Sequence, residues 1–106
     1  MAQNKSSLFS PQEIELAEMA KALAHPARIK ILNVLTDKNI CMCGDIVDLL
    51  PLAQPTVSQH LRELKRVGLI RGEIEGPKTC YCLDHDKIKK AKDAFQSLFA
   101  AVCQRC

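Results

Sequence analysis

The six cysteines of this 106-residue sequence fall into three closely spaced pairs, and this spacing is its strongest chemical signal. Thiolates are soft ligands that select ions such as As(III), Sb(III), Cd(II), Pb(II) or Cu(I), and they also accept Zn(II). The pairs therefore predict a site for a thiophilic metal or metalloid ion. In order along the chain, they are Cys41/Cys43, Cys80/Cys82 and Cys103/Cys106.

Cys41 and Cys43 are the predicted centre of this site. They precede the largely apolar segment 46–50, which predicts a short helix that starts around residues 42–45 and ends before Pro51. On a regular helix, residues two positions apart point about 200° away from each other. Both cysteines can therefore hold one ion only if the start of this helix is not helical. Ion binding and a well-formed helix would compete, which predicts a switch.

As(III) needs a third sulfur, which the other pairs could supply. Cys103 and Cys106 lie at i and i+3 of a predicted helix and so share one face. Either is a candidate third ligand, but both also fit the apolar stripe of that helix, where a cysteine serves as a small hydrophobe. Cys80 and Cys82 share one face of a predicted strand. Because they lie far from Cys41 along the predicted fold, we expect them to have a separate role or none.

The elements that position these cysteines follow from helix caps and apolar periodicity. A capping box at Ser10 and Glu13 opens the first helix, and Pro26 opens a second that should be central and buried. Gly68 is a typical residue at a helix end, and alternating segments on either side of Gly76 predict a β-hairpin. A single domain spans residues 1–106, with terminal helices at 11–24 and 84–106, a helix-turn-helix at 43–68 and a hairpin wing at 69–83.

The fourth predicted helix has the pattern of a DNA-recognition helix. Leu61 and Leu64 fall within about 40° of Val57 at 100° per residue, so all three face the protein. The opposite side carries short hydrogen-bonding side chains near its start, which suit base edges, and arginines further along, which suit phosphates. A solvated surface helix would show the same pattern, so the pattern alone leaves DNA binding open. The polar side and its shoulders consist of Thr56, Ser58, Gln59, Arg62, Glu63 and Arg66.

Four segments together resemble the ArsR/SmtB family of metal-sensing winged-helix repressors. They are residues 23–32, 41–43, 54–61 and 67–70, in the order and spacing of that family over about residues 14–100. The resemblance implies a mainly α fold with a small β-hairpin, in which a winged helix-turn-helix dimerises through its first and last helices. It also implies binding to operator DNA and release by an inducer. By position, it implies DNA contacts from the recognition helix and the wing, at Gln54, Thr56, Ser58, Gln59, Arg62, Arg71 and Lys78.

The C-x-C pair resembles that of the arsenic-sensing and cadmium/lead-sensing members of the family, which implies As(III) or Sb(III) as the inducer. The third cysteine of the arsenic sensors would fall at Ile46, and this departure leaves the third ligand open. The family's carboxylate and histidine site is incomplete, because Asp84 and His85 have no ligating partners about a dozen residues later. His60 lies nearer the protein side of its helix, and we expect it to pack there.

Composition bounds the class of protein. The net charge of +3, from 15 Lys+Arg against 12 Asp+Glu, permits nucleic-acid binding without proving it. Apolar stripes on the terminal helices predict a homodimer, because so small a core cannot cover them. The start of the sequence has no apolar signal core and no apolar run spans a bilayer, so we expect a cytoplasmic protein without a membrane partner.

Three other functions can be weighed against a metal-responsive repressor. A dithiol redox or sulfide-responsive repressor on the same scaffold would lose DNA on oxidation without metal. A structural-zinc interaction module would use a Cys₄ site made of Cys41, Cys43, Cys103 and Cys106. An enzyme has the least support, because the C-x-x-C pair ends the last helix and no Ser/His/Asp grouping or phosphate-binding Gly-rich loop is present. DNA binding itself is expected to require no cofactor.

Overall fold

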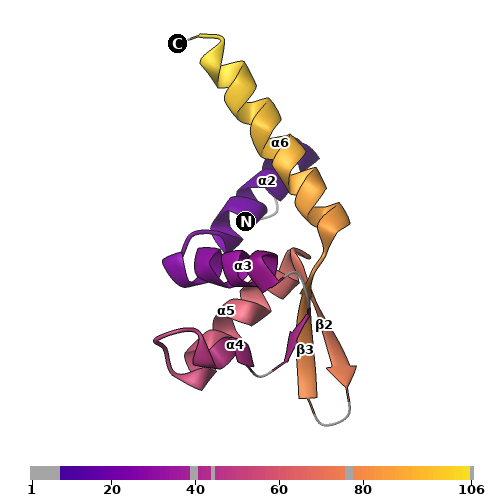
Figure 1. Ribbon diagram of the computed structural model, residues 1–106. Coiled ribbons are helices and arrows are strands. Elements are labelled where there is room, and N and C mark those ends of the chain that lie inside the picture. Colours follow the sequence, from indigo (N-terminus) through magenta and orange to yellow (C-terminus); the bar gives the residue numbers. More distant parts are fainter. Residues whose placement is uncertain (1–7, 39–40, 44, 76–77, 106) are drawn as a thin grey trace.

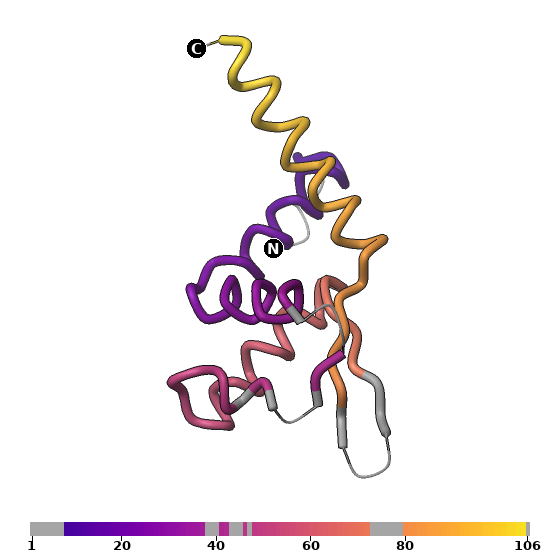
Figure 2. Tube along the Cα trace, viewed as in Figure 1, coloured from indigo at the N-terminus to yellow at the C-terminus, as the bar shows by residue number. Residues whose placement is uncertain are grey.

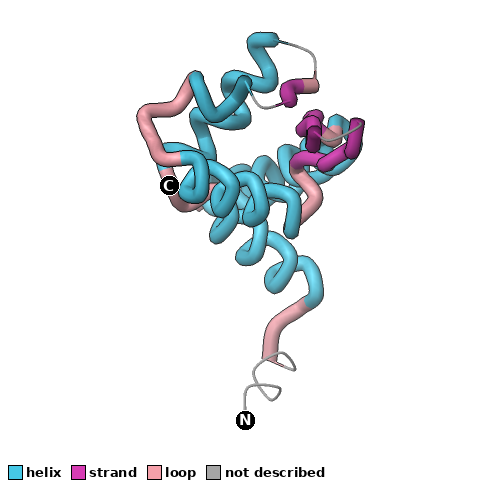
Figure 3. The backbone as a smooth tube through the Cα atoms, turned by 90° about the horizontal axis from the view of Figure 1, so that it is seen from below, coloured by secondary structure: helices cyan, strands magenta, loops and turns pink. Residues whose placement is uncertain are grey.

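Helices form most of the molecule, and three short strands gather at one side of them, as the computed structural model shows (Figures 1 and 3). The structure describes residues 8–38, 41–43, 45–75 and 78–105, except for the side chains of residues 38, 43, 45, 47, 73–75 and 78–79. Along the chain the elements are α2 (Pro11–Ala22), α3 (Pro26–Lys38), β1 (Met42–Cys43), α4 (Asp45–Asp48), α5 (Gln54–Arg66), β2 (Ile70–Glu75), β3 (Lys78–Leu83) and α6 (His85–Cys103).

Helices α2 and α3 begin where their caps predict. The Ser10 hydroxyl accepts a hydrogen bond of 3.0 Å from the Glu13 N–H, and the Glu13 carboxylate accepts one of 2.9 Å from the Ser10 N–H. This is the predicted capping box, which satisfies backbone donors that a helix start leaves unpaired. At the start of α3, the Nδ1 atom of His25 accepts a hydrogen bond of 3.0 Å from the Ala27 N–H.

Helices α4 and α5, joined by residues 49–53, form the helix-turn-helix. Helix α5 buries Val57, Leu61 and Leu64 almost completely and packs on α3. It ends at Arg66, and Gly68, two residues further on, has a φ of +85° in the left-handed region that favours glycine. The Gly68 N–H donates to the Lys65 carbonyl at 3.0 Å, and the Leu69 N–H donates to the Leu64 carbonyl at 3.1 Å, as in a Schellman motif. This turn sends the chain directly into β2.

The wing hairpin of β2 and β3 is joined by β1 in a three-stranded antiparallel sheet, in the order β1-β3-β2. The predicted hairpin of β2 and β3 is confirmed, and the winged helix-turn-helix with it. The third helix, predicted to start around residues 42–45, begins at the end of that range, because α4 starts at Asp45 and residues 42–43 form strand β1. Figure 2 shows this short strand lying beside the hairpin. Pairing with β3 uses the backbone groups of β1 that a helix would have used.

The core lies between the helix-turn-helix, α3 and the base of the wing. Helix α3 buries Ala27, Ile31 and Leu35, but Ile29 is 42% exposed, so this helix is less enclosed than its sequence predicts. None of the described helices is long and apolar enough to cross a membrane. The buried cluster consists of Met19, Ile31, Leu35, Met42, Ile46, Leu50, Val57, Leu61, Leu64, Leu69 and Ile70.

The terminal helices carry apolar surface that this core does not cover. Helix α6 has no fully buried residue, and its far half extends beyond the rest of the chain (Figure 1). Its lower half packs on α2, where Ile88, Ala91 and Phe95 contact the core in part. Further along α6, Leu98, Phe99 and Val102 are 43%, 63% and 55% exposed, and on the α2 side Leu8, Phe9 and Ile14 are 77%, 54% and 39% exposed.

Candidate nucleic-acid interface and thiol site

The exposed side of α5 carries polar side chains that are hydrogen-bonded to one another. An Nη atom of Arg62 donates a 2.9 Å hydrogen bond to the Gln59 amide oxygen, and the Gln54 amide nitrogen donates a 3.3 Å hydrogen bond to the Ser58 hydroxyl. Gln54, Gln59 and Arg62 are exposed, Ser58 is half-buried, and the neighbouring Thr56 is exposed. The buried positions on the opposite side of α5 hold these groups outward. Such a surface can meet base edges and phosphates in a groove.

Arg66 is engaged within the protein. It makes an ion pair of 2.8 Å with Glu18 on α2 and another of 3.3 Å with Glu63, one turn back on α5. The hydrogen bond to Glu18, followed by that to Glu63, raises the pKa of Arg66 above its usual value. Two carboxylates already compensate this guanidinium, so Arg66 is a weaker candidate for a phosphate contact than Arg62.

The wing residues occupy opposite strands of the hairpin. Arg71 is exposed on β2 and lies across from Cys82 on β3. Lys78 begins β3, where its backbone pairs with that of Glu75, and its side chain lies outside those described. Both predicted wing residues therefore belong to the strands that follow the recognition helix.

His60 links α5 to the start of α3. It is 6% exposed, as predicted for a packing residue, and its Nδ1 atom accepts a hydrogen bond of 3.1 Å from the Nε–H of Arg28. The His25 ring lies against it at a centroid distance of 4.3 Å. Burial lowers the pKa of His60 below its usual value, and the charges of His25 and Arg28 lower it further. This histidine is therefore held neutral, with Nδ1 as an acceptor.

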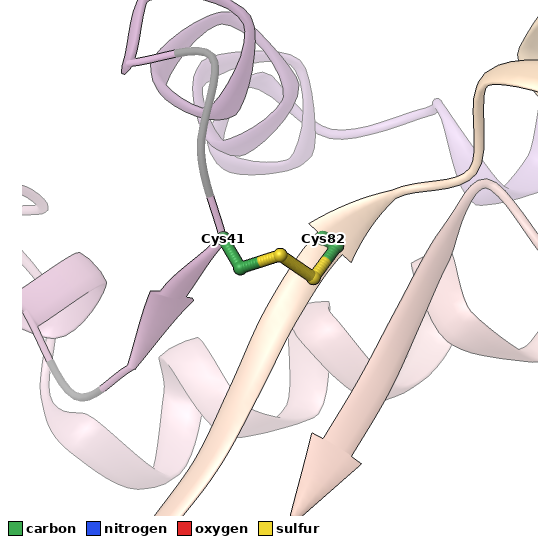
Figure 4. Close-up of a disulfide and its surroundings, with 2 residues drawn as sticks. All are labelled: Cys41 and Cys82. Atoms are coloured by element: carbon green, nitrogen blue, oxygen red, sulfur yellow. A yellow bond between two sulfur atoms is a disulfide. The ribbon is translucent and has the colours of Figure 1, made fainter. Parts of the chain in front are cut away.

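The cysteines are arranged differently from the prediction. Cys41, at the entry to β1, forms a disulfide with Cys82 on β3, and their Cα atoms are 4.3 Å apart (Figure 4). Two residues after Cys41, Cys43 of β1 lies opposite Cys80 of β3. The expectation that Cys80 and Cys82 lie far from Cys41 is wrong, because β1 pairs with β3. Sequence reasoning missed this partner, although each C-x-C pair matches the period of a strand.

The third pair lies elsewhere. Cys103 ends α6 and is exposed as a free thiol, at the opposite end of the molecule from the wing (Figure 1). Cys106 lies outside the described residues. Within one chain, Cys82 and not Cys103 lies beside Cys41. Cys103 or Cys106 as the third ligand, and the alternative Cys₄ zinc site, stay predictions. Among the described side chains, no group of three or more His, Cys, Asp or Glu is arranged to hold a metal ion.

Comparison with known proteins connects this fold to one family. A family model described as bacterial regulatory protein, arsR family, matches residues 25–71. An uncharacterized HTH-type transcriptional regulator of Methanocaldococcus jannaschii is 37% identical over 75 residues, which cover 70% of this chain and 83% of the relative. The cadmium resistance transcriptional regulatory protein CadC homolog of Staphylococcus aureus is 32% identical over 87 residues, covering 81% and 71%. An arsenical resistance operon repressor of Staphylococcus xylosus is 33% identical over 72 residues, covering 68% of each.

Solved structures share the fold. An ArsR-like transcriptional regulator from Rhodococcus sp. RHA1 superposes with a TM-score of 0.75 at 22% identity, covering 91% of this chain and 90% of that one. The homodimeric winged helix-turn-helix DNA-binding domain of a possible ArsR-family regulator from Mycobacterium bovis has a TM-score of 0.66 at 24% identity, covering 94% and 84%. At these identities the likeness concerns the fold alone.

Proposed function

Because the chain belongs to the bacterial regulatory protein family arsR, whose members are DNA-binding transcriptional regulators, we propose how this regulator binds and how it is released. As a homodimer, it represses transcription by binding operator DNA. It is released when cysteine thiolates bind a thiophilic metal or metalloid ion, with As(III) or Sb(III) the foremost inducers. Relatives named for cadmium resistance and arsenical resistance support this class of inducer.

The polar side of α5 would bind the major groove. Its amino-terminal turns, with Gln54, Thr56 and Ser58, would reach base edges or phosphates, and Gln59 and Arg62 would follow along the groove. Arg71 and Lys78 would contact the backbone from the wing. Since helix-turn-helix dimers bind two half-sites related by two-fold symmetry, the operator should be a palindrome.

The proposed release by an inducer rests on the position of Cys41 and Cys43. Both precede α4 by a few residues, in an extended segment where positions two apart share one face. Both cysteines can therefore bind one ion without unwinding a helix. The predicted competition between ion binding and helix formation is thus not needed. Helix α4 starts at Asp45 and is anchored by the buried Ile46. A shift of residues 41–43 on ion binding would move α4 and, through the turn, α5.

A homodimer is supported by the uncovered apolar surface. Leu98, Phe99 and Val102 are exposed on α6, Ile14 is exposed on α2, and Leu8 and Phe9 are exposed just before α2. Burying one such Phe or Leu contributes about 2 kcal/mol. Pairing α2 and α6 of two protomers would cover these side chains, and the fold is also that of a homodimeric domain.

One observation favours a second candidate function, in which the inducer is an oxidant. Cys41 and Cys82 are joined by a disulfide. When the two thiols form this bond, they release two protons and pass two electrons to an oxidant such as a peroxide or a low-molecular-weight disulfide. Because the bond ties β1 to the wing, oxidation could change the placement of the helix-turn-helix as an ion would.

A DNA-binding titration of the reduced protein tests both candidates. A duplex selected by the protein from a random library serves as the operator. Fluorescence anisotropy then follows its release by As(III), Sb(III), Cd(II), Pb(II), Zn(II) or hydrogen peroxide. Release by As(III) or Sb(III) under reducing conditions would support the metalloid-responsive repressor. Release by peroxide alone would favour the redox candidate, and retention of DNA in every titration would reject both.

A further inference from the structure

The two C-x-C pairs meet across adjacent strands, so that four cysteines occupy neighbouring positions. Met42 pairs with Tyr81 and Cys43 pairs with Cys80, while Cys41 is bonded to Cys82 one step further along. Met42 and Tyr81 both face the buried cluster. Since successive residues of a strand alternate between its faces, the four cysteine positions lie together on the other face.

We propose that, in the reduced protein, Cys41, Cys43, Cys80 and Cys82 form one thiolate site, in which three or four sulfurs bind a single thiophilic ion. The wing strand β3 then supplies the ligands that the C-x-C pair beside α4 lacks. The existence of this site stands on the strand register. It rests on the proposed function only for the role of the bound ion as the inducer.

The spacing of the four positions fits one ion. Neighbouring strands lie about 4.8 Å apart, and positions two apart on a strand are separated by about 6.6 Å. Metal–sulfur bonds of about 2.3 Å on each side of an ion cover such spans when the side chains tilt towards each other. The Cα separation of 4.3 Å between Cys41 and Cys82 already brings two sulfurs together. Cys80 is also disulfide-bonded in the structure, so the disulfides of Cys41, Cys80 and Cys82 must be reduced before their sulfurs can bind an ion.

The surroundings of the site favour soft ligation. Cys80 and Cys82 are 3% and 5% exposed, whereas Cys41 is exposed. An ion can therefore enter at Cys41 and lose its water to the two buried sulfurs.

The chemistry needs no oxidant. With arsenous acid, each As–S bond that forms replaces an As–O bond, and the displaced hydroxide leaves with the thiol proton as water. Three thiols thus give one trithiolate complex and three waters, and arsenic stays As(III). With Cd(II), each ligating thiol releases its proton to the solvent, and up to four thiolates replace bound water.

Such an ion would join two parts of the DNA-binding surface. Cys43 lies just before α4, the first helix of the helix-turn-helix, and Cys80 and Cys82 belong to the wing. In the reduced protein without an ion, β1 is held to β3 by the backbone of two residues only. A shared ion would therefore fix the distance between the wing and the helix-turn-helix. The affinity of the protein for DNA would depend on this distance.

Thiol protection in the reduced full-length wild-type protein tests the site without DNA. The protein is loaded with As(III) or Cd(II) alone, treated with an alkylating reagent and mapped by mass spectrometry. We expect at least three of the four cysteines of the proposed site to be protected from alkylation, while Cys103 and Cys106 are alkylated. Protection of Cys103 or Cys106 in place of Cys80 and Cys82, or no protection at all, would overturn the proposal.

Variants separate this proposal from the proposed function. The Cys80→Ser/Cys82→Ser double variant, checked for its fold by circular dichroism, should bind Cd(II) at least about tenfold more weakly, with a weaker thiolate-to-cadmium absorption band. Cys103→Ser is the matched control and should bind as the wild type does. If the double variant binds Cd(II) as the wild type does, the four-cysteine site is wrong, even where As(III) still releases DNA. If the wild type binds the ion at these cysteines but keeps its DNA, the proposed function fails and the site stands.

Discussion

The Nε–H of Arg28 donates a hydrogen bond of 3.1 Å to the Nδ1 atom of His60, joining α3 to the buried side of the recognition helix. An Nη atom of the same guanidinium donates to the carbonyls of Lys21 and Ala22, at 3.2 and 3.3 Å. One side chain therefore connects the end of α2, the start of α3 and the middle of α5. The placement of the helix that is proposed to bind DNA depends on this connection.

Replacing Arg28 with Met should lower the free energy of unfolding by about 1–3 kcal/mol, because it removes the side-chain donor to the His60 nitrogen and to the Lys21 and Ala22 carbonyls at the end of α2. Chemical denaturation followed by circular dichroism measures this change. Arg105→Met is the matched control, since Arg105 is exposed beyond the end of α6. Equal destabilisation by both variants would contradict a structural role for the Arg28–His60 bond.

Stability should fall when the solution is acidified below about pH 6.5, the usual pKa of histidine. Burial, together with His25 and Arg28, lowers the pKa of His60 in the folded protein, so the unfolded chain binds this proton more readily. The stabilisation is complete above pH 6.5 and is lost as the pH falls towards the lowered pKa. Protonation of the His60 Nδ1 atom would also break its hydrogen bond with Arg28, because a protonated nitrogen cannot accept the Arg28 Nε–H. A His60→Gln variant should show a flatter dependence of unfolding free energy on pH between 5 and 7, and an unchanged slope would argue against this explanation.

Arg62→Ala should weaken DNA binding for all sequences and reduce the slope of log K against log salt by about 1, as the loss of one phosphate contact does. Arg66→Ala should have a smaller effect on this slope, because Glu18 and Glu63 already pair with Arg66. Anisotropy titrations over a salt series compare the two variants. A larger effect of Arg66→Ala would reverse the assignment of the phosphate contact.

Phe99→Asp should convert the proposed dimer into monomers. Phe99 is 63% exposed in the single chain, whereas Phe95 packs partly against the core, so the change at Phe99 tests association with little effect on the fold. Sedimentation velocity at micromolar concentration measures the change. Gln96→Asp adds the same charge to an exposed position of the same helix and controls for it. A monomeric wild type would refute the dimer through α2 and α6.

The Cys41→Ser/Cys43→Ser double variant should leave the affinity of the reduced protein for DNA unchanged and should abolish its release by As(III), because only two of the four proposed ligand sulfurs remain. The ion is proposed to bind where residues 41–43 meet α4, and its coupling to DNA should be about 1–3 kcal/mol, the same in either direction. Competition anisotropy with As(III) measures it, with Cys103→Ser as the control on α6. Wild-type release of the double variant would place the sensing site elsewhere.

Local signals in the sequence determined most of the fold. The capping box of Ser10 and Glu13, the buried side of α5 and the left-handed Gly68 depend on residues within a few positions of each other, and all three occur as predicted. Because such interactions are short-range, their spacing is visible in the sequence. The same signals identified the side of α5 that the protein presents to solvent.

The tertiary structure alone decided which cysteines meet. Cys41 and Cys82 are 41 residues apart, and a two-residue strand has too few residues to show its period. The short apolar segment after residue 41 fits a helix start as well as a strand. Residues 42–43 become extended because the edge of β3 offers them backbone partners, and packing of the hairpin against α3 and α5 determines where that edge lies. The register of a long-range strand pair, set by packing that no local pattern contains, therefore placed four cysteines together.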